Sequence, residues 1–321
     1  MTPPPSPIQP FSDGVLRIAT RSSNQARTQA GIVADQLRRR WPTLKVDLVF
    51  VETLGDRTQQ HEVPLHRIGG QGVFVKEVQR AVLDGRADLA VHSAKDLTST
   101  PTDGLEMAAV TARRDPRDAL IGRSLATLDL GATVATGSVR RRAQLAELRP
   151  DLRFVELRGN INRRLEKIPA DGAILMAVAA LEVLDLTDLV AEAFDPEVMV
   201  PQVGQGAVVV ECRVDVPGIL EACRAIEDPV SRQAIEIERA FLAEIGSGCS
   251  LPVGAYATPP DADGRRRLLT YLQSAPKSGV NARTGVTSGA RRTVELDGLC
   301  HGDDLDLARR LAHELAVSAG Q

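Results

Sequence analysis

Short apolar runs alternate with amphipathic segments along the first two thirds of the chain. Residues 15–20 form the first apolar run, which predicts a buried strand, and apolar positions then recur every three or four residues, which predicts a helix capped near Ser22 or Ser23. Further strands are expected near 45–52, 89–91, 106–111, 132–135, 153–157 and 172–177. Helices are expected near 74–82, 139–148, 161–168 and 178–184. This alternation predicts an α/β protein with mixed, mostly parallel sheets covered on both faces.

Two interruptions of the pattern mark crossings between domains. Residues 113–118 combine charge with proline, and residues 201–206 are rich in glycine and glutamine. A third, small α+β domain is expected to begin near 228, with a helix at each end and hairpin strands between them. The predicted division is a disordered tail over 1–14, a first domain over 15–113 plus 207–226, a second over 117–200, and a third over 228–321.

Four polar turns follow predicted strands, at residues 20–23, 92–96, 136–141 and 158–160. Three of them open into a helix, whose free N–H groups and dipole favour an anion. Arg140 and Arg141 oppose that dipole, so we expect something negative to bind there. Strand ends of this kind line the ligand cleft of α/β sheets. The turns therefore predict a cleft for a polyanionic ligand, in which Asp96 is the one acid and the first candidate for chemistry.

Each of these features also has an ordinary structural explanation. Asp96 alone could be a helix N-cap or a loop carboxylate, and the run Arg140–Arg142 could be a solvated helix face. Their position after apolar strands favours the functional interpretation. Residues 54–72 are polar, contain several glycines and show no clear period, which predicts a mobile loop that acts as a lid.

Composition narrows the possible partners. The net charge is −3 and aromatic residues make up 3% of the chain, so general attraction to nucleic acid or membranes and base-stacking surfaces are disfavoured. No apolar run approaches the roughly 18–20 residues that span a bilayer, and the N-terminus lacks the features of a signal peptide. We therefore expect a cytoplasmic protein with reduced cysteines. Scattered histidines and the absence of a CxxC pair argue against a metal site.

Cys249 differs from the other three cysteines. Small residues flank it over 246–250, which leaves its sulfur accessible, whereas Cys212, Cys223 and Cys300 are expected to be buried small hydrophobes. No histidine lies beside Cys249 in the sequence, which weakens a Cys–His protease interpretation.

Taken together, these segments resemble the porphobilinogen deaminase (hydroxymethylbilane synthase) family over about residues 15–257. The matching stretches, in the family's order, are 16–21, 69–77, 87–96, 114–118, 137–141, 157–160, 203–207, 238–241 and the Cys249 loop. The resemblance implies three α/β domains, of which the first two are similar to periplasmic binding proteins and enclose the active site. It also implies a dipyrromethane cofactor joined by a thioether to Cys249.

The resemblance implies a transferase of porphyrin and heme biosynthesis. Four porphobilinogen units are joined head to tail with release of ammonia, and hydrolysis frees hydroxymethylbilane. The expected enzyme is a cytoplasmic monomer whose partner is this small molecule, with no nucleic acid and no membrane. Each pyrrole carries an acetate and a propionate, so the growing chain is the polyanion that the arginine turns anticipate.

The resemblance assigns a role to eleven residues. Asp96 aligns with the catalytic aspartate, which stabilises positive charge on the reacting pyrroles and relays protons. The residues expected to hold the cofactor are Cys249, Lys95, Ser138, Arg140, Arg141 and Arg164. Those expected to bind substrate are Arg21, Ser23, Arg158 and Phe74.

Two positions depart from the family pattern. Gln71 stands where a lysine is usual, and Val183 where an arginine helps to hold substrate. These departures keep open the alternative of an inactive paralogue that binds pyrroles without joining them. The two-lobed fold and the arginines leave two further alternatives: a solute-binding module, and a binder of phosphate or nucleic acid through Arg140–Arg142.

Overall fold

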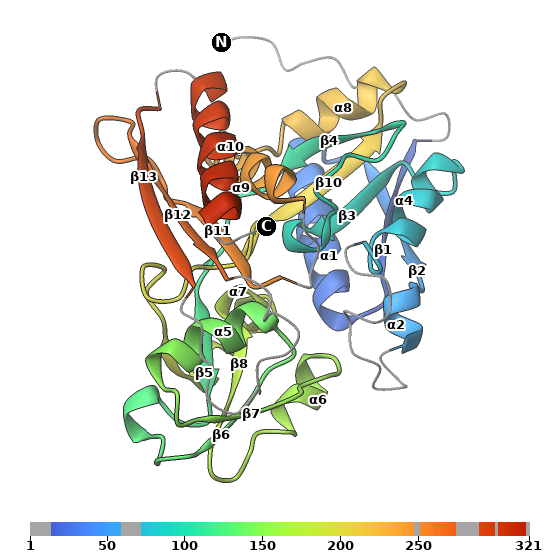
Figure 1. Ribbon diagram of the computed structural model, residues 1–321. Helices are drawn as coiled ribbons and strands as arrows, with labels where there is room; N and C mark the ends of the chain where they lie inside the picture. Colours follow the sequence, from blue (N-terminus) through green and yellow to red (C-terminus); the bar gives the residue numbers. More distant parts are fainter. Residues whose placement is uncertain (1–13, 59–71, 247–250, 274–288, 299–300, 319–321) are drawn as a thin grey trace.

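The computed structural model describes residues 14–58, 72–246, 251–273, 289–298 and 301–318, and these form three sheets (Figure 1). The first sheet has the strand order β2-β1-β3-β10-β4 and the second β7-β6-β8-β5-β9, while the third is β11-β12-β13. The strands of the first sheet are β1 (Val15–Arg21), β2 (Lys45–Val51), β3 (Leu89–Ser93), β4 (Leu105–Val110) and β10 (Val208–Arg213). Those of the second are β5 (Asp118–Ile121), β6 (Thr133–Ala135), β7 (Arg153–Val155), β8 (Ala173–Ala177) and β9 (Val190–Ala193). Those of the third are β11 (Val253–Ala257), β12 (Arg266–Leu272) and β13 (Ala290–Leu296).

Helices cover the sheets in an order that follows the chain. Around the first sheet lie α1 (Asn24–Arg40), α2 (Leu54–Thr58), α4 (Lys76–Leu83), the 3-10 turn η2 (Ala94–Asp96) and α8 (Pro217–Arg224). Around the second lie η3 (Leu125–Thr127), α5 (Val139–Leu148), α6 (Ile161–Leu165), α7 (Val178–Glu182) and η4 (Thr187–Leu189). The third sheet is packed against α9 (Pro229–Ile245) and α10 (His301–Ser318), drawn in orange and red in Figure 1.

The expected α/β class with mixed sheets is confirmed. In the first sheet, β1 pairs in parallel with β2 and β3, whereas β10 is antiparallel to β3 and β4. In the second sheet, β6 pairs in parallel with β7 and β8, whereas β5 is antiparallel to β8 and β9. The antiparallel pairs thus come from β5 and β10, the two strands that directly follow the crossings between the sheets.

The burial of β1 shows why its sequence folds as it does. Leu16 and Ile18 point to the same face and pack with Val33 and Leu37 of α1, while Ala19 belongs to a separate cluster with Val78 of α4. Both faces of the strand are covered, so its near-continuous apolar run suits the interior of a sheet that carries helices on both sides.

Side-chain caps begin the helices that follow the polar turns. Ser23 accepts from the backbone N–H of Ala26 at the start of α1, and Ser138 accepts from that of Arg141 at the start of α5. Asn160 caps α6 in the same way. The predicted helix over 139–148 is confirmed at both ends, because a good cap precedes it.

Several expectations for local structure were wrong. Residues 54–58, expected to be part of a loop, form α2, and the remainder of the predicted lid over 59–71 lies outside the described residues. Asp118, expected within the first crossing, is the first residue of β5. The strand has only four residues and begins with a charged one, so the sequence pattern did not indicate it. The predicted helix over 161–168 ends at Leu165.

The predicted domain boundaries stay a prediction. The three sheets fall within the ranges proposed for the three domains. The crossings themselves are joined, since the backbone N–H of Arg114 donates to the carbonyl of Gly206 at 2.9 Å. Glu238 of α9, fully buried, accepts from Arg113 in one crossing and from the backbone N–H of Gly204 in the other. The buried carboxylate of Glu238 therefore joins both crossings to α9, the helix that packs against the third sheet.

Two negative findings hold for the described part of the chain. None of its helices is both long and apolar enough to cross a bilayer. Within the same residues, no group of histidine, cysteine and acidic side chains is arranged to hold a metal ion.

Candidate active site

One cavity of about 290 Å³ is lined by the strand-end turns of both five-stranded sheets. Its lining includes ten of the eleven residues predicted for the site, and the eleventh, Cys249, lies outside the described residues. We call the group from the first sheet's turns the first wall, consisting of Arg21, Ser23, Phe74, Lys95 and Asp96. The group from the second sheet's turns is the second wall, consisting of Ser138, Arg140, Arg141, Arg158 and Arg164. The fold thus brings together side chains that the sequence separates by up to about 140 residues.

In the first wall, Arg21 is held from two sides. Its Nε donates to both carboxylate oxygens of Asp56 in α2 at 3.2 Å, and its guanidinium carbon lies 4.1 Å from the centre of the Phe74 ring. Burial raises the pKa of Asp56, but the hydrogen bonds and charge of Arg21, together with Thr53, outweigh this and lower the pKa overall. Arg21 therefore enters the cavity already paired with one carboxylate.

Lys95 is the second cation of the first wall. Burial, together with the nearby charges of Arg141 and Arg164, lowers its pKa from 10.5 to about 8, against the opposing charges of Asp96 and Asp118. Its ammonium group makes no hydrogen bond or ion pair with any described residue. A carboxylate bound in the cavity would relieve this unpaired charge.

Gly204 allows the return crossing to approach this turn closely. Its φ is +75°, and a Cβ atom there would lie 2.8 Å from the backbone of Ala94 and 2.9 Å from the nitrogen of Lys95. The side-chain amide of Gln202 also donates to the carbonyl of Lys95 at 3.2 Å. The backbone that carries Lys95 and Asp96 is therefore positioned by the segment that joins the two sheets.

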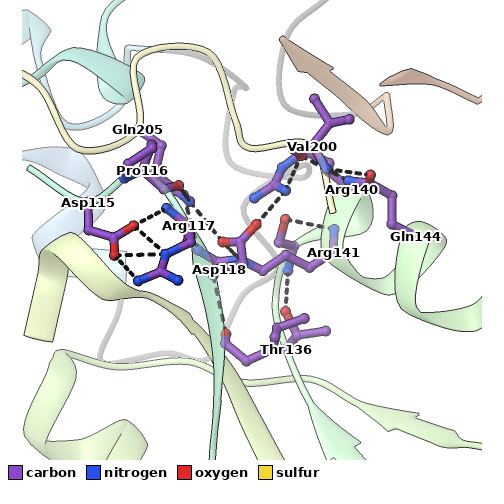
Figure 2. A network of polar contacts seen from close by, with 12 residues as sticks. Asp115, Pro116, Arg117, Asp118, Thr136, Arg140, Arg141, Gln144, Val200 and Gln205 are labelled. Atoms are coloured by element: carbon purple, nitrogen blue, oxygen red, sulfur yellow. Dashed lines mark hydrogen bonds and ion pairs between the residues drawn. The ribbon is translucent and has the colours of Figure 1, made fainter. Parts of the chain in front are cut away.

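The second wall is built on a buried carboxylate (Figure 2). Arg140 Nη1 donates to one oxygen of Asp118 at 2.6 Å, and Arg141 Nε donates to the other at 2.8 Å. Gln205 Nε2 donates to the same oxygen as Arg141, at 2.9 Å. Asp118 is fully buried, and although burial raises its pKa, the charges of Arg140 and Arg141 lower it overall to about 2. The carboxyl group is therefore ionised at neutral pH.

This arrangement corrects part of the sequence-based interpretation. Arg140 and Arg141 were expected to need a bound anion at the start of their helix, and the protein itself supplies one in Asp118. The compensation is incomplete, because one carboxylate faces two guanidinium groups. Burial lowers the pKa of Arg141, because removing a guanidinium group from water disfavours its charged form.

Unsatisfied donors show where a ligand fits. Arg140 is 3% exposed, and its Nε and Nη2 are buried without a hydrogen-bond partner among the described residues. Burial lowers the pKa of Arg164 to about 10, helped by the charges of Arg141 and Arg158. Buried guanidinium donors of this kind suit bidentate carboxylates. The second wall therefore fits a cofactor that carries several carboxylates, as dipyrromethane does.

Sequence reasoning missed four residues of the site. Asp118 and Gln205 organise the second wall, Asp56 holds Arg21, and Arg239 of α9 lines the cavity while donating to the carbonyl of Thr98 at 2.8 Å. Three of the four lie in stretches that carried the resemblance, but nothing local indicated their partners. A lone acid directly before an apolar run was the available signal for Asp118.

Several residues discussed from the sequence do not line the cavity. His92 lies in β3, 3.1 Å from Glu211, and does not line the cavity. Cys212 and Cys223 are buried and unbridged, and burial raises the pKa of Cys212 to about 12. Cys300 lies outside the described residues. Val183 is 6% exposed and does not itself line the cavity, although Leu184 beside it does.

Comparisons with known proteins agree on one family. The family model "Porphobilinogen deaminase, dipyromethane cofactor binding domain" matches residues 16–221, and "Porphobilinogen deaminase, C-terminal domain" matches residues 232–271. Porphobilinogen deaminase from Roseiflexus castenholzii is 40% identical over 311 residues, which cover 95% of this chain and 97% of the relative. That from Geotalea uraniireducens is 38% identical over 294 residues, or 90% and 91% of the two chains.

Among solved structures, the methionine-binding protein MetQ matches with 14% identity and a TM-score of 0.43, covering 68% of this chain and 93% of MetQ. That likeness is too distant to bear on the assignment. The family model spans well over half of the chain, and the relatives match nearly all of it. The chain therefore belongs to the porphobilinogen deaminase family.

Proposed function

We propose that the cavity between the two walls is where this chain carries out its family's reaction, with Asp96 as the catalytic residue. The chain is a transferase of tetrapyrrole biosynthesis that joins four porphobilinogen molecules head to tail, releases ammonia and yields hydroxymethylbilane. The observation that supports the site most strongly is its charge pattern. Among the described residues that line the cavity there is one acid, Asp96, and the cations are Arg21, Lys95, Arg140, Arg141, Arg158, Arg164 and Arg239.

The dipyrromethane cofactor belongs to the second wall in this proposal. Cys249 would hold it through a thioether, and Leu251, two residues later in the chain, lines the cavity. Arg140, Arg141 and Arg164 would bind its carboxylates, with Lys95 and Ser138 as further donors. When bound, the cofactor supplies the pyrrole carbon to which the first substrate unit is joined.

The first wall takes the incoming substrate in this proposal. Arg21 would bind a carboxylate of porphobilinogen, Ser23 would donate a hydrogen bond, and the Phe74 ring would pack against the pyrrole. Arg158 would take a further carboxylate from the opposite side. Such contacts would hold the substrate in the same cavity that Asp96 lines.

Asp96 has two tasks that follow from its surroundings. Loss of ammonia from porphobilinogen leaves a cation, and a fixed carboxylate inside a cavity stabilises developing positive charge better than water does. The same carboxylate can give a proton to the departing amine and accept one from the pyrrole carbon. The surrounding cations would bind carboxylates, whereas Asp96, the one acid among the described lining residues, favours positive charge.

A direct experiment separates this proposal from the inactive-paralogue alternative. Incubation of the purified protein with porphobilinogen should release ammonia and give a product that cyclises to uroporphyrinogen. Asp96→Ala should stop turnover while the cofactor adduct is still assembled on the protein. Normal turnover in that variant would remove Asp96 from the mechanism, and an inert wild-type protein that still binds porphobilinogen would favour the paralogue.

Three accompanying properties are part of the same proposal. The chain would act in the cytoplasm as a monomer, and it would bind no nucleic acid. The net charge of −3 and the burial of Arg140 and Arg141 in the lining of the cavity support the last point. Size-exclusion chromatography with light scattering tests the oligomeric state.

A further inference from the structure

We propose that Asp118 is a positioning residue for the dipyrromethane cofactor: it fixes two guanidinium groups so that selected donors stay free for the cofactor's carboxylates. The inference rests on the proposed function, because it takes Arg140 and Arg141 as cofactor-binding residues. Asp118 does not line the cavity and acts only through its neighbours.

Asp118 accepts hydrogen bonds from some of the N–H donors of its neighbours and leaves others free. Its two oxygens accept from Arg140 Nη1, Arg141 Nε and Gln205 Nε2 at 2.6–2.9 Å. Backbone carbonyls take more of the donors, since Arg140 Nη1 also reaches Val200 and Arg141 Nη1 reaches Leu175. Arg140 Nε and Nη2 remain without a partner among the described residues.

The charge balance points to the same ligand. One buried carboxylate opposes two buried guanidinium groups, so the cluster keeps one positive charge in a place where an uncompensated charge is costly. A single carboxylate from the cofactor would neutralise that charge and satisfy the free donors of Arg140 at once. Without Asp118 the cluster would carry two positive charges, and the guanidinium groups would separate.

The same carboxylate ties the cofactor site to both crossings. Asp118 begins β5 directly after the first crossing, and Gln205 belongs to the return crossing. Gln205 Nε2 donates to Asp118 and to the carbonyl of Pro116, and its oxygen accepts from Arg141 Nη2 at 3.2 Å. The two arginines are therefore held at a fixed place relative to the segments that connect the two walls.

The first test follows cofactor assembly in the full-length chain. Apoprotein is incubated with porphobilinogen, and intact mass records the fraction that gains two linked pyrrole units over time. Asp118→Asn keeps the shape of the side chain but removes its charge, so assembly should slow at least about tenfold, the effect of losing one charge-assisted hydrogen bond. In the loaded fraction, kcat should fall while KM changes less than about twofold, because the incoming substrate uses the first wall.

Asp115→Asn is the matched control. Asp115 lies three residues earlier and forms an ion pair with Arg117 through both oxygens, but neither residue lines the cavity (Figure 2). This variant also removes one charge and one Arg–Asp pair from the same crossing. It should assemble the cofactor at the wild-type rate, and equal slowing in the two variants would assign the effect to the crossing in general and overturn the proposal.

Two further variants keep the outcome decisive. If Asp118→Asn does not fold, Gln205→Leu is the second variant. It removes one hydrogen bond to Asp118 but leaves the charge of Asp118 in place. It should keep the fold and still slow cofactor assembly about threefold. Wild-type assembly in a folded Asp118→Asn protein, or in Gln205→Leu, would overturn the positioning role. Arg140→Leu tests the proposed function separately. If this variant loads its cofactor normally, Arg140 does not bind the cofactor. If Arg140→Leu loads slowly while the Asp118 and Gln205 variants load at the wild-type rate, only the role of Asp118 is rejected.

Discussion

The two walls of the cavity carry similar charges but are built differently. In the second wall, Arg140 and Arg141 are more than nine-tenths buried and share a fully buried carboxylate with a glutamine. In the first wall, the Arg21 side chain is 17% exposed and its partner Asp56 is 16% exposed. Lys95 beside it has no partner among the described residues. One wall is fixed by internal ion pairs, and the other is more accessible and less constrained.

The difference suits two kinds of ligand. The second wall is buried and held together by internal hydrogen bonds, so its side chains lose little conformational freedom when a ligand binds. Such a site favours a cofactor that stays bound for the life of the protein. Partly exposed cations, as in the first wall, bind carboxylates more weakly because water screens their charge. Weaker binding favours a ligand that must arrive and leave in every cycle. We therefore expect mutations in the second wall, apart from Arg158, to affect cofactor content. Mutations in the first wall, apart from Lys95, should affect substrate affinity.

The largest effect is expected for Arg164→Leu in the second wall. Arg164 is partly buried, and its Nε donates to the carbonyl of Gly159 at 2.8 Å. Burial and the charge of Arg141 lower its pKa to about 10, against the opposing charge of Asp96. Removing Arg164 should slow cofactor assembly about 10- to 100-fold, the effect of one lost contact between charged groups. Intact mass of the freshly purified variant measures this. A fully loaded Arg164→Leu protein with a raised KM would reverse the assignment of the walls.

Arg21→Leu should give a smaller and different change. The variant should load its cofactor normally and show a KM for porphobilinogen raised about tenfold, because one carboxylate contact is lost. Asp56 already engages part of the Arg21 guanidinium, so the loss is less than for an unpaired arginine. Steady-state kinetics on protein of verified mass measures the change. Loss of cofactor in this variant would mean that the walls do not divide the two tasks.

Much of this arrangement could be predicted from the sequence. The starts of three helices were predicted correctly from local patterns, and the structure shows them capped by Ser23, Ser138 and Asn160. Because strand ends gather at one edge of a sheet, the turns also predicted that distant arginines meet. These predictions depend only on residues close together in the chain.

The partners of those residues could not be predicted in the same way. Asp118 contacts side chains 22, 23 and 87 residues away, and the antiparallel strand β10 returns to the first sheet only after the second is complete. Such contacts arise from tertiary structure and leave no local pattern. Arg140 and Arg141 were consequently expected to be free for a ligand, although several of their donors are used internally.

The pH dependence of cofactor assembly tests Lys95. Burial lowers its pKa to about 8, so the side chain is cationic below that pH and neutral above it. Its attraction for carboxylates is therefore lost as the pH rises through about 8. The ratio of assembly rates for Lys95→Arg over wild type should rise a fewfold between pH 7 and pH 9, since arginine keeps its charge throughout. A constant ratio would exclude a charge role for Lys95.

The smallest effect is expected at Val183. This side chain is buried next to Leu184, which lines the cavity, and an arginine here would extend a guanidinium towards the substrate. Val183→Arg should lower the KM for porphobilinogen by a fewfold and leave cofactor content unchanged. Val183→Leu serves as the size control. An unchanged KM for a folded Val183→Arg protein would refute the position inferred from the family pattern.

The most direct test of the central claim is the intact mass of the purified protein and of its Cys249→Ser variant. If a tethered group occupies the second wall, the wild-type mass exceeds the sequence mass by two linked pyrrole units, and the variant shows the sequence mass alone. A wild-type protein at its sequence mass after incubation with porphobilinogen, or a variant that keeps the excess, would contradict the account.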